Sequence, residues 1–475
     1  MQPTPTSITA LPTTPPAERA SRWALASLAL SMLLSSLGTS IANVGLPTLA
    51  QAFDASFQQV QWVVLAYLLA VTTLVVSVGR LGDLLGRKRL LLGGIAVFTL
   101  ASLACAMAPT LWLLIAARAA QGLGAATMMA LTMAFVGQAL PKKKTGSAMG
   151  MLATMSAIGT ALGPMLGGVL IAAMDWRALF WVNLPLGLLS LLLAWRYLPL
   201  DGQAKKDAGF DPLGTLLLAL TLAAYALAMT LGRGHFGSLN LALLLAAAGG
   251  LGLFLLAESR VASPLIRLDL FRNPRLSASL TSSALVTTVM MSTLVVGPFY
   301  LARGLGLAAP LVGLALSVGP LVAALTGMPA GRLADHWGAA RITLLGLVAM
   351  VVGALLLALL PSAFGVAGYM ASIAVLTCGY GLFQTANNTA VMADVAHVQR
   401  GLVSGLLNLA RNLGLVSGAS LMGAVFAFAS HAEDIGQARP EALANGMHLT
   451  FAVAGALLLA ALAISVHGLA ARKPV

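Results

Sequence analysis

Residues 79–89 read GRLGDLLGRKR, and this polar stretch separates two long apolar runs. It combines four cations, one acid and three glycines. A soluble core has no need of such an arrangement, whereas a short loop rich in Arg and Lys stays on the cytoplasmic side of a membrane. A second copy, residues 327–341, reads GMPAGRLADHWGAAR. The acids Asp83 and Asp335 lie 252 positions apart (335 − 83), so the sequence predicts two related halves with an insertion between them.

The composition is that of a polytopic membrane protein built from α-helices. Of the 475 residues, 59% are hydrophobic and 9% are charged, against about 25% charged in an ordinary soluble domain. The mean hydropathy is +0.93. Cys105 and Cys378 both fall in apolar stretches, so neither a disulfide nor a metal site is expected from them. The sequence has no GxxxxGK(S/T) phosphate loop, no Ser-His-Asp set and no metal-ligand cluster, and we do not expect an enzyme.

Fourteen apolar stretches are long enough to cross a membrane, since a helical span needs about 20 residues. They group as six, then two, then six, because polar breaks separate the middle pair from its neighbours. Two six-helix halves in parallel arrangement are a recurring transporter design. The expected spans are 23–46, 58–79, 89–108, 111–136, 146–172, 178–197, 212–231, 239–257, 277–301, 309–331, 341–360, 366–392, 402–429 and 447–470.

The predicted organisation has five parts. The first, rich in Pro and Thr, is expected to be a disordered tail and not a cleavable signal peptide. The others are two bundles, a linker pair and a short tail. The boundaries are 1–22 for the first tail, 23–200 for the first six-helix bundle, 201–274 for two linker helices with flanking loops, 275–470 for the second bundle and 471–475 for the last tail.

The distribution of positive charge predicts the orientation. If both termini are cytoplasmic, the loops and tails on that side hold 21 of the 27 Lys and Arg, the opposite loops hold four, and two fall within helices. This asymmetry is typical of cytoplasmic loops, and it accounts for the net charge of +13 without a nucleic-acid partner. We expect a multi-pass protein of the plasma membrane with both termini cytoplasmic.

Two further motifs mark the fourth and fifth spans. Arg118 and Gln121 share one helix face at spacing i, i+3, and a charge inside a membrane helix needs a cavity or a partner. In the next span, glycines at i, i+4 and i+8 form a smooth stripe that lets a neighbouring backbone approach closely, and a proline kinks the helix. The glycines of this stripe are Gly159, Gly163 and Gly167, and the proline is Pro164.

With these motifs in place, the chain resembles the major facilitator superfamily, specifically its fourteen-helix drug:proton antiporter branch, over about residues 23–470. The resemblance implies that two bundles rock about a midplane cavity by alternating access and export a substrate. It implies that the Arg118 motif acts in proton transfer or in switching, with a buried structural arginine as the alternative. It also implies that the glycine stripe seals the transporter against leak and shapes the switch.

The repeated loops are expected to act as a gate. Asp83 would pair with cations or with a helix N-terminus across the interface between the halves, and the pairing would break when the protein opens inward. The alternative is that these charges only fix the topology. The predicted gating residues are Gly79, Asp83, Gly86, Arg87, Gly331, Asp335 and Arg411.

The first span reads LGTSIANVGLP at residues 37–47 and departs from the branch motif at one position, where Gly38 replaces the usual Asp. None of the 14 acids falls in the middle third of a predicted span, so we expect no carboxylate in the central cavity. Neutral, zwitterionic or anionic substrates are then favoured over strongly cationic drugs. The predicted polar lining is Asn43, Arg118, Gln121, Gln384, Asn387 and Asn388, with contacts between helices as the alternative for the last three.

We therefore expect an efflux transporter of drugs or other small amphipathic molecules. Its partners would be membrane lipid, a small-molecule substrate and protons. No cofactor is expected, the proton gradient would supply the energy, and the protein would be a monomer. The first alternative is an uncoupled or import-type metabolite carrier of the same fold, and the second is a membrane sensor or scaffold that transports nothing.

Overall fold

The computed structural model describes residues 15–139, 145–199, 211–231, 237–261, 271–359, 361, 364–393, 400–430 and 438–470, and every regular element within these ranges is a helix. Thirteen described stretches are long and apolar enough to cross a membrane, and the described apolar part of one more helix, Ile158–Ala173, is shorter. The expected class, an all-α polytopic membrane protein, is confirmed. Residues 1–14 and 471–475, which hold most of both predicted tails, lie outside the described residues.

The first half consists of six long helices joined by short ones. The connecting helices are α2 (Leu46–Ala52) and α7 (Ala178–Trp181). The long helices are α1 (Pro15–Val44), α3 (Phe57–Leu85), α4 (Arg87–Ala106), α5 (Leu111–Ala139), α6 (Thr145–Ala173) and α8 (Asn183–Tyr197).

A helical hairpin, α9 (Pro212–Thr230) and α10 (Ser238–Arg260), separates this half from the second. Two short π-helices, η3 (Tyr300–Gly304) and η5 (Gly418–Met422), occur in the second half. Its α-helices are α11 (Pro274–Phe299), α12 (Ala309–Trp337), α13 (Ala339–Leu359), α14 (Gly365–Ala393), α15 (Arg400–Ser417), α16 (Gly423–Ala429) and α17 (Pro440–Ala470).

Several helices extend beyond the apolar stretches that predict them. The first helix begins at Pro15, not at residue 23, so residues 15–22 are helical although they were expected in the disordered tail. Two prolines stand in its first turn, where a missing N–H costs little, and Ala, Glu and Arg follow, which favour helix. Likewise α3 and α12 continue through the polar motifs to Leu85 and Trp337, because a helix ends where its hydrogen bonding ends and not where hydrocarbon ends.

The two repeated motifs end their helices in the same backbone conformation. Gly86 has φ 94° and ψ 126°, and Gly338 has φ 87° and ψ 137°. A side chain is strained at such positive φ, which glycine adopts readily. These two glycines are 252 positions apart (338 − 86), as are Asp83 and Asp335. The similarity of the two halves therefore includes the turn that reverses the chain.

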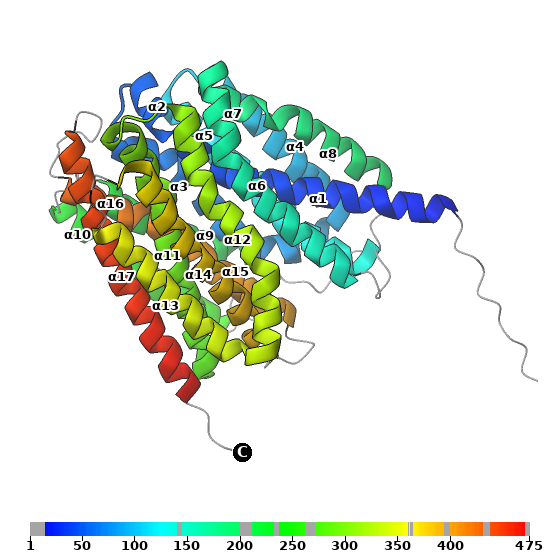
Figure 1. Cartoon of the computed structure of the whole chain (residues 1–475). Coiled ribbons are helices and arrows are strands. Elements are labelled where there is room, and N and C mark those ends of the chain that lie inside the picture. Colours follow the sequence, from blue (N-terminus) through cyan, green and yellow to red (C-terminus); the bar gives the residue numbers. More distant parts are fainter. Residues whose placement is uncertain are drawn as a thin grey trace, which may run out of the picture.

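The two halves lie together at one side of the molecule and diverge toward the other (Figure 1). We call the side with the Gly86 and Gly338 turns the hinge side. The opposite side, with α2, the start of α3 at Phe57, and η3, is called the closed side. In Figure 1, α1, α6 and α8 run toward the hinge side in a different direction from α12, α13 and α17. Contacts between the halves therefore concentrate near the closed side.

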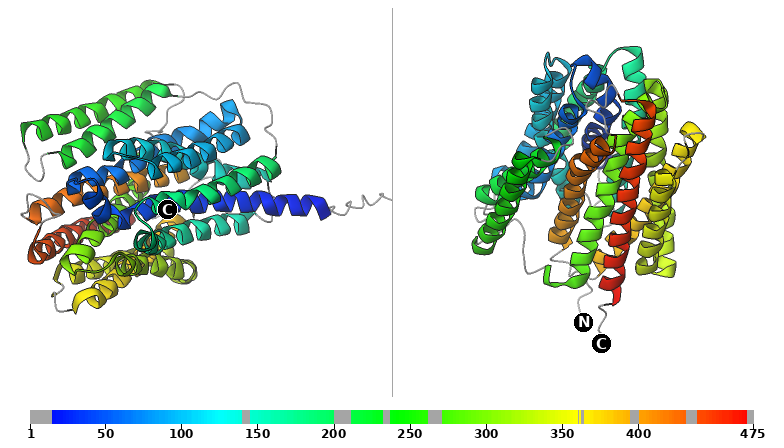
Figure 2. Two further views of the ribbon diagram at one scale, coloured as in Figure 1. Left: turned by 90° about the horizontal axis from the view of Figure 1, so that it is seen from above. Right: turned by 90° about the vertical axis from the view of Figure 1, so that its left-hand side faces the viewer.

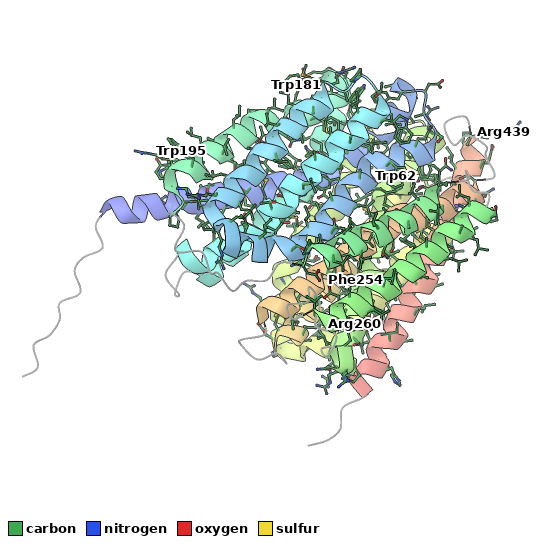
Figure 3. The ribbon with its side chains drawn as sticks, turned by 180° about the vertical axis from the view of Figure 1, so that it is seen from behind. Trp62, Trp181, Trp195, Phe254, Arg260 and Arg439 are labelled. Atoms are coloured by element: carbon green, nitrogen blue, oxygen red, sulfur yellow. The ribbon has the colours of Figure 1, made fainter. Side chains whose placement is uncertain are left out.

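The α9–α10 hairpin lies at the edge of the bundle (green in Figure 2, left). It is fastened to α3 at both ends, because Trp62 Nε1 donates to Thr230 Oγ1 at 3.0 Å and the hydroxyls of Ser77 and Thr215 lie 2.9 Å apart. Only 17% of the membrane-spanning window of α10 is buried, and Figure 3 shows this helix on the outer face. The hairpin therefore covers the outside of α3 and presents α10 to lipid.

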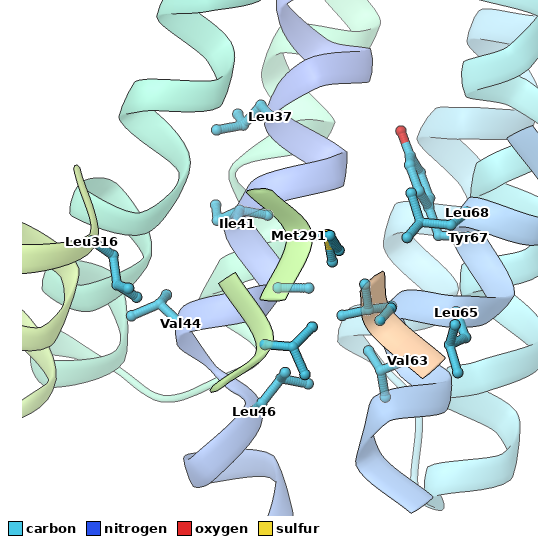
Figure 4. Close-up of a cluster of buried hydrophobic side chains, with 14 of the residues drawn as sticks. Leu37, Ile41, Val44, Leu46, Val63, Leu65, Tyr67, Leu68, Met291 and Leu316 are labelled. Carbon is cyan, nitrogen blue, oxygen red and sulfur yellow. The ribbon is translucent and has the colours of Figure 1, made fainter. Parts of the chain in front are cut away.

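The hydrophobic core is continuous between the halves. Ile41 and Val44 of α1, Met291 of α11 and Leu316 of α12 belong to one buried cluster. Figure 4 shows the Leu316 side chain pointing toward Val44 and Met291 lying between α1 and α3. Apolar burial of this kind is worth about 25 cal/mol per Å², so the closed side is held by packing as well as by polar contacts.

Candidate functional site

Arg118 is completely buried inside the first half. Its Nε donates to the carbonyl oxygen of Val63 at 2.9 Å, and its Nη1 donates to Gln121 Oε1. The guanidinium also lies 4.3 Å from the centroid of the Tyr67 ring, a cation–π contact that is worth more in a desolvated site. The predicted shared face of Arg118 and Gln121 is thus present, and its contacts go to protein groups.

The same network reaches two more helices. Gln121 Nε2 donates to Ser102 Oγ of α4 at 2.7 Å, and the Tyr67 hydroxyl donates to the carbonyl oxygen of Ser35 in α1 at 2.7 Å. The network therefore joins α1, α3, α4 and α5. Arg118 Nη2 has no hydrogen-bond partner although it is buried, and among the described residues no carboxylate pairs with the guanidinium.

Gly38 lies directly beside this network. A Cβ atom placed on it would meet Tyr67 Oη at 3.1 Å and the Phe98 ring at 3.2 Å. The side of α1 where related sequences are expected to carry an acid is therefore filled by aromatic groups from α3 and α4. At this position α1 therefore carries no acid that could neutralise Arg118, and aromatic groups occupy the space beside Gly38.

The glycine stripe of α6 packs against α1. A methyl group at Gly159 would come within 2.5 Å of the Leu33 carbonyl oxygen, and one at Gly163 would meet the backbone nitrogen of Ile41 at 2.9 Å. The serine hydroxyls of Ser36 and Ser156 also join these two helices at 2.7 Å. Gly167 continues the same face, and Pro164 lies inside the helix. The close backbone approach that the stripe predicts is confirmed.

A neighbouring glycine of α6 faces the second half instead. A Cβ at Gly168 would lie 2.5 Å from the carbonyl oxygen of Ala309 and 3.2 Å from the Cα of Gly313. Gly313 in turn faces the carbonyl of Pro164. One helix thus has two glycine faces, one toward its own half and one toward α12. No pattern in the sequence predicted the second face, because Gly313 is a single glycine 145 positions away (313 − 168).

The predicted polar lining divides into two groups. Asn43 is buried, and its amide nitrogen donates to carbonyls of its own helix, at 3.0 Å for Thr39 and 3.2 Å for Ser40. In α14, Gln384 and Asn388 lie one turn apart on one face and are half-buried, and their side-chain oxygens have no hydrogen-bond partner.

Unpaired buried oxygens are uncommon and require an explanation. Asn387, on another face of the same helix, is buried. Asn43, Arg118 and Gln121 do not line the cleft described below, and whether any of the six residues contacts a substrate stays a prediction.

Most of the predicted gating residues lie in the hinge-side parts of their helices, whereas Arg411 lies where α15 packs against α11. Asp335 is exposed and forms no ion pair with any described residue, and its role in a gate stays a prediction. Arg411 is half-buried in α15, and its carbonyl accepts a hydrogen bond from Thr287 Oγ1 at 3.1 Å. Gly331 lies within α12. The side-chain surroundings of Gly79 and Asp83 lie outside the described part of the chain, and the pairing of Asp83 and Arg87 stays a prediction.

A cleft of about 300 Å³ opens on the closed side where the halves meet. It holds a cation, Arg303, beside polar and apolar groups from both halves. Its lining residues are Val44, Pro47, Thr48 and Gln51 from the first half and Ala302, Arg303, Leu307, Ala309 and Val312 from the second. The cleft lies beside the Gly168–Gly313 contact, and no predicted site residue lines it.

The closed side has a further set of contacts that the sequence analysis missed. The Phe57 ring lies 4.7 Å from that of Phe299 and 5.6 Å from that of Phe426, and Gln61 Nε2 donates to the Ala419 carbonyl at 3.0 Å. No local pattern marked this contact, because Gln61 and Ala419 lie 358 positions apart along the chain. In the described part of the chain, no three His, Cys, Asp or Glu side chains gather as a metal site.

Residues 28–419 match the family model of the Major Facilitator Superfamily, and residues 282–470 match it a second time. The chain belongs to the major facilitator superfamily. The second match covers the second half by itself, in line with the repeated turns. This superfamily and its fold are those of transporters and in general not of enzymes, and the chain is an integral membrane transporter.

Relatives within the superfamily differ in their named roles. The uncharacterised transporter YebQ of Escherichia coli is 32% identical over 95% of this chain and 96% of its own length. The riboflavin transporter RibZ of Clostridioides difficile is 30% identical over 84% of this chain and 87% of its own. The multidrug resistance protein Stp of Mycobacterium tuberculosis is 31% identical over 84% of this chain and 74% of its own.

A solved structure supports the superfamily fold. The bacterial homologue of the human lysosomal transporter Spinster, in an inward-facing and occupied conformation, superposes with a TM-score of 0.70. It covers 98% of this chain and 100% of its own, at 15% sequence identity. At that identity the likeness concerns the fold alone.

Proposed function

We propose that this member of the superfamily is a secondary active efflux transporter, which exports small amphipathic molecules across the plasma membrane by alternating access coupled to proton antiport. The proposal counts α6 as a span, giving fourteen helices in a 6+2+6 arrangement. The first bundle would be residues 23–200, the linker pair 201–274 and the second bundle 275–470. Both termini and the hinge side would be cytoplasmic, and the protein would act as a monomer without a cofactor.

The observation that supports this proposal best is the asymmetry of contact between the halves. They are joined on the closed side by glycine, aromatic and amide contacts, and they diverge on the hinge side. A membrane protein that only sensed or scaffolded would not need two repeated halves joined at one side, whereas alternating access requires closure on one side at a time. The name of Stp supports export as the direction.

The interior chemistry suggests the class of substrate. The buried guanidinium of Arg118 has no acid beside it among the described residues, and the predicted acid position is Gly38. The oxygens of Gln384 and Asn388 have no protein donor, so a substrate that carries N–H or O–H groups would satisfy them. We therefore propose neutral, zwitterionic or anionic molecules as substrates, in preference to strongly cationic drugs, which a carboxylate would attract.

Expression in a bacterium that lacks its main efflux pumps tests the proposal. Growth in a panel of antibiotics and dyes should show raised tolerance to neutral or zwitterionic compounds, and Asp83→Asn should abolish it at equal protein level. Transport in proteoliposomes with an imposed pH gradient then tests the coupling. Unchanged tolerance to every compound, together with no gradient-driven flux of any of them, would remove efflux as the function.

The name of RibZ supports a second candidate, a carrier of a metabolite. Counter-flow of radiolabelled riboflavin in proteoliposomes, with and without a pH gradient, separates the two. Exchange of riboflavin that is indifferent to the gradient would favour the uncoupled carrier, and gradient-driven export of drugs would favour the antiporter.

A further inference from the structure

The first two turns of α3 pack against α11, η5 and α16 of the second half. Phe57, the first residue of the helix, packs edge-on against Phe299 of α11 and against Phe426 of α16, with centroid distances of 4.7 Å and 5.6 Å. All three rings are buried. Aromatic pairs in this edge-to-face geometry stabilise a contact beyond the effect of burying their apolar area. The first half thus places a ring between two helices of the second half.

One turn further along α3, the buried amide of Gln61 makes a polar contact with the same part of the second half. Gln61 is 1% exposed, and its Nε2 donates to the Ala419 carbonyl at 3.0 Å. This carbonyl belongs to the π-helix η5, Gly418–Met422. A π-turn takes its carbonyls out of the regular i→i+4 ladder, and such turns are frequent at functional sites. The widened turn lets a donor from the other half of the protein reach a backbone acceptor.

The residue that follows the π-helix, Gly423, lies directly against the side-chain amide of Gln61. A Cβ placed on Gly423 would collide with Gln61 Nε2, and its next two neighbours are Gln61 Cδ at 3.0 Å and Oε1 at 3.4 Å. The three nearest atoms therefore all belong to one side chain of the opposite half. The amide of Gln61 therefore occupies the space that a side chain at position 423 would need, so a methyl group there would displace this amide from its hydrogen bond to Ala419.

We propose that Phe57 and Gln61 of α3, seated against η5 and Gly423, form the latch that holds the closed side shut. The proposal rests on the alternating access proposed above and names the residues that must separate when this side opens. Phe57 supplies apolar burial, and Gln61 supplies a hydrogen bond that is satisfied only when the halves are together. Gly423 leaves the space that the closed position requires.

A double-mutant cycle tests the latch. Spin labels on Ala52→Cys and Arg439→Cys, in a background with Cys105→Ala and Cys378→Ala, report the distance between the halves on the closed side in lipid nanodiscs. We expect Gln61→Ala and Gly423→Ala each to raise the ratio of long to short distances about fivefold, as the loss of one net hydrogen bond implies. Because the added methyl fits the space that the amide leaves, the double variant should show no larger change than Gln61→Ala alone.

The control is Gln58→Ala, in the same helix, because the Gln58 side chain makes no hydrogen bond among the described residues and its loss should leave the distances unchanged. Thermal unfolding of each variant shows whether it remains folded. The latch is wrong if both single variants keep the wild-type distribution, or if the effects of the two multiply in the double variant. The distances are measured without substrate, so a failure of drug export with a shifted distance contradicts the proposed function and leaves the latch standing.

Discussion

The contact between α6 and α12 allows a matched pair of alanine substitutions on one helix. Gly168 faces the second half, where a methyl group would lie 2.5 Å from the Ala309 carbonyl oxygen. Gly159 faces α1 of its own half, where a methyl group would lie 2.5 Å from the Leu33 carbonyl oxygen. The clash is the same in size and in the type of atom, and only its place differs. Gly168→Ala should therefore change the balance of conformations, and Gly159→Ala should change stability.

The magnitude follows from the geometry. A carbon atom is comfortable at about 3.3 Å from a carbonyl oxygen, so α6 must move about 0.8 Å from its neighbour at either site. Overpacking of this kind costs about 1–3 kcal/mol. At Gly168 the protein can avoid that cost by separating its halves on the closed side, and the ratio of open to closed forms should rise about 5- to 150-fold. At Gly159 the two helices belong to one bundle, so the cost lowers the free energy of unfolding.

Two measurements separate these outcomes. Spin-label distances across the closed side should lengthen for Gly168→Ala and stay at the wild-type value for Gly159→Ala. The midpoint of thermal unfolding should fall for Gly159→Ala and change much less for Gly168→Ala. If both variants gave the same pair of results, the assignment of Gly168 to the moving interface would be refuted.

Three shorter predictions concern other parts of the molecule. Gly86→Ala should lower the unfolding midpoint, because a side chain is strained by about 1–3 kcal/mol at the backbone angles of Gly86, φ 94° and ψ 126°. Gly93→Ala in the adjoining helix, where a Cβ would have no atom within 4 Å, should raise the midpoint slightly. Gln384→Ala should weaken substrate binding in a titration with little change in stability, since the Gln384 side-chain oxygen has no protein partner. Its control is Asn240→Ala, which removes three hydrogen bonds and should lower stability without affecting binding. Arg118→Lys should lower the free energy of unfolding by about 3 kcal/mol in chemical unfolding, because a lysine ammonium cannot reproduce the two hydrogen bonds and the ring stacking of the planar guanidinium. An unchanged midpoint would contradict a structural role for Arg118.

Much of the fold could be predicted from the sequence because bilayer thickness sets a simple length rule. Most spans begin or end within a few residues of their predicted positions, and the repeat of Asp83 at Asp335 indicated the two halves correctly. Helix ends were less predictable, since α1 starts at Pro15 and α3 ends at Leu85. Apolar length locates the part inside hydrocarbon, whereas capping and glycine conformation decide where the helix stops.

The site was predictable only in part, for a different reason. Local spacing identified the face shared by Arg118 and Gln121 and the glycine stripe that begins at Gly159. It could not reveal that Gln61 meets Ala419, since that contact joins positions 358 apart through a π-turn that no short motif marks. Contacts between the halves depend on how two bundles dock, and a single sequence carries no local signal for that.

Alternating access requires that the two sides of the molecule open in turn. Two label pairs test it most directly, one on the closed side at Ala52→Cys and Arg439→Cys, and one on the hinge side at Leu85→Cys and Trp337→Cys. Across wild type and Gly168→Ala, we expect the hinge-side distance to shorten whenever the closed-side distance lengthens. Two distances that lengthen together, or a closed-side distance that changes alone, would contradict it.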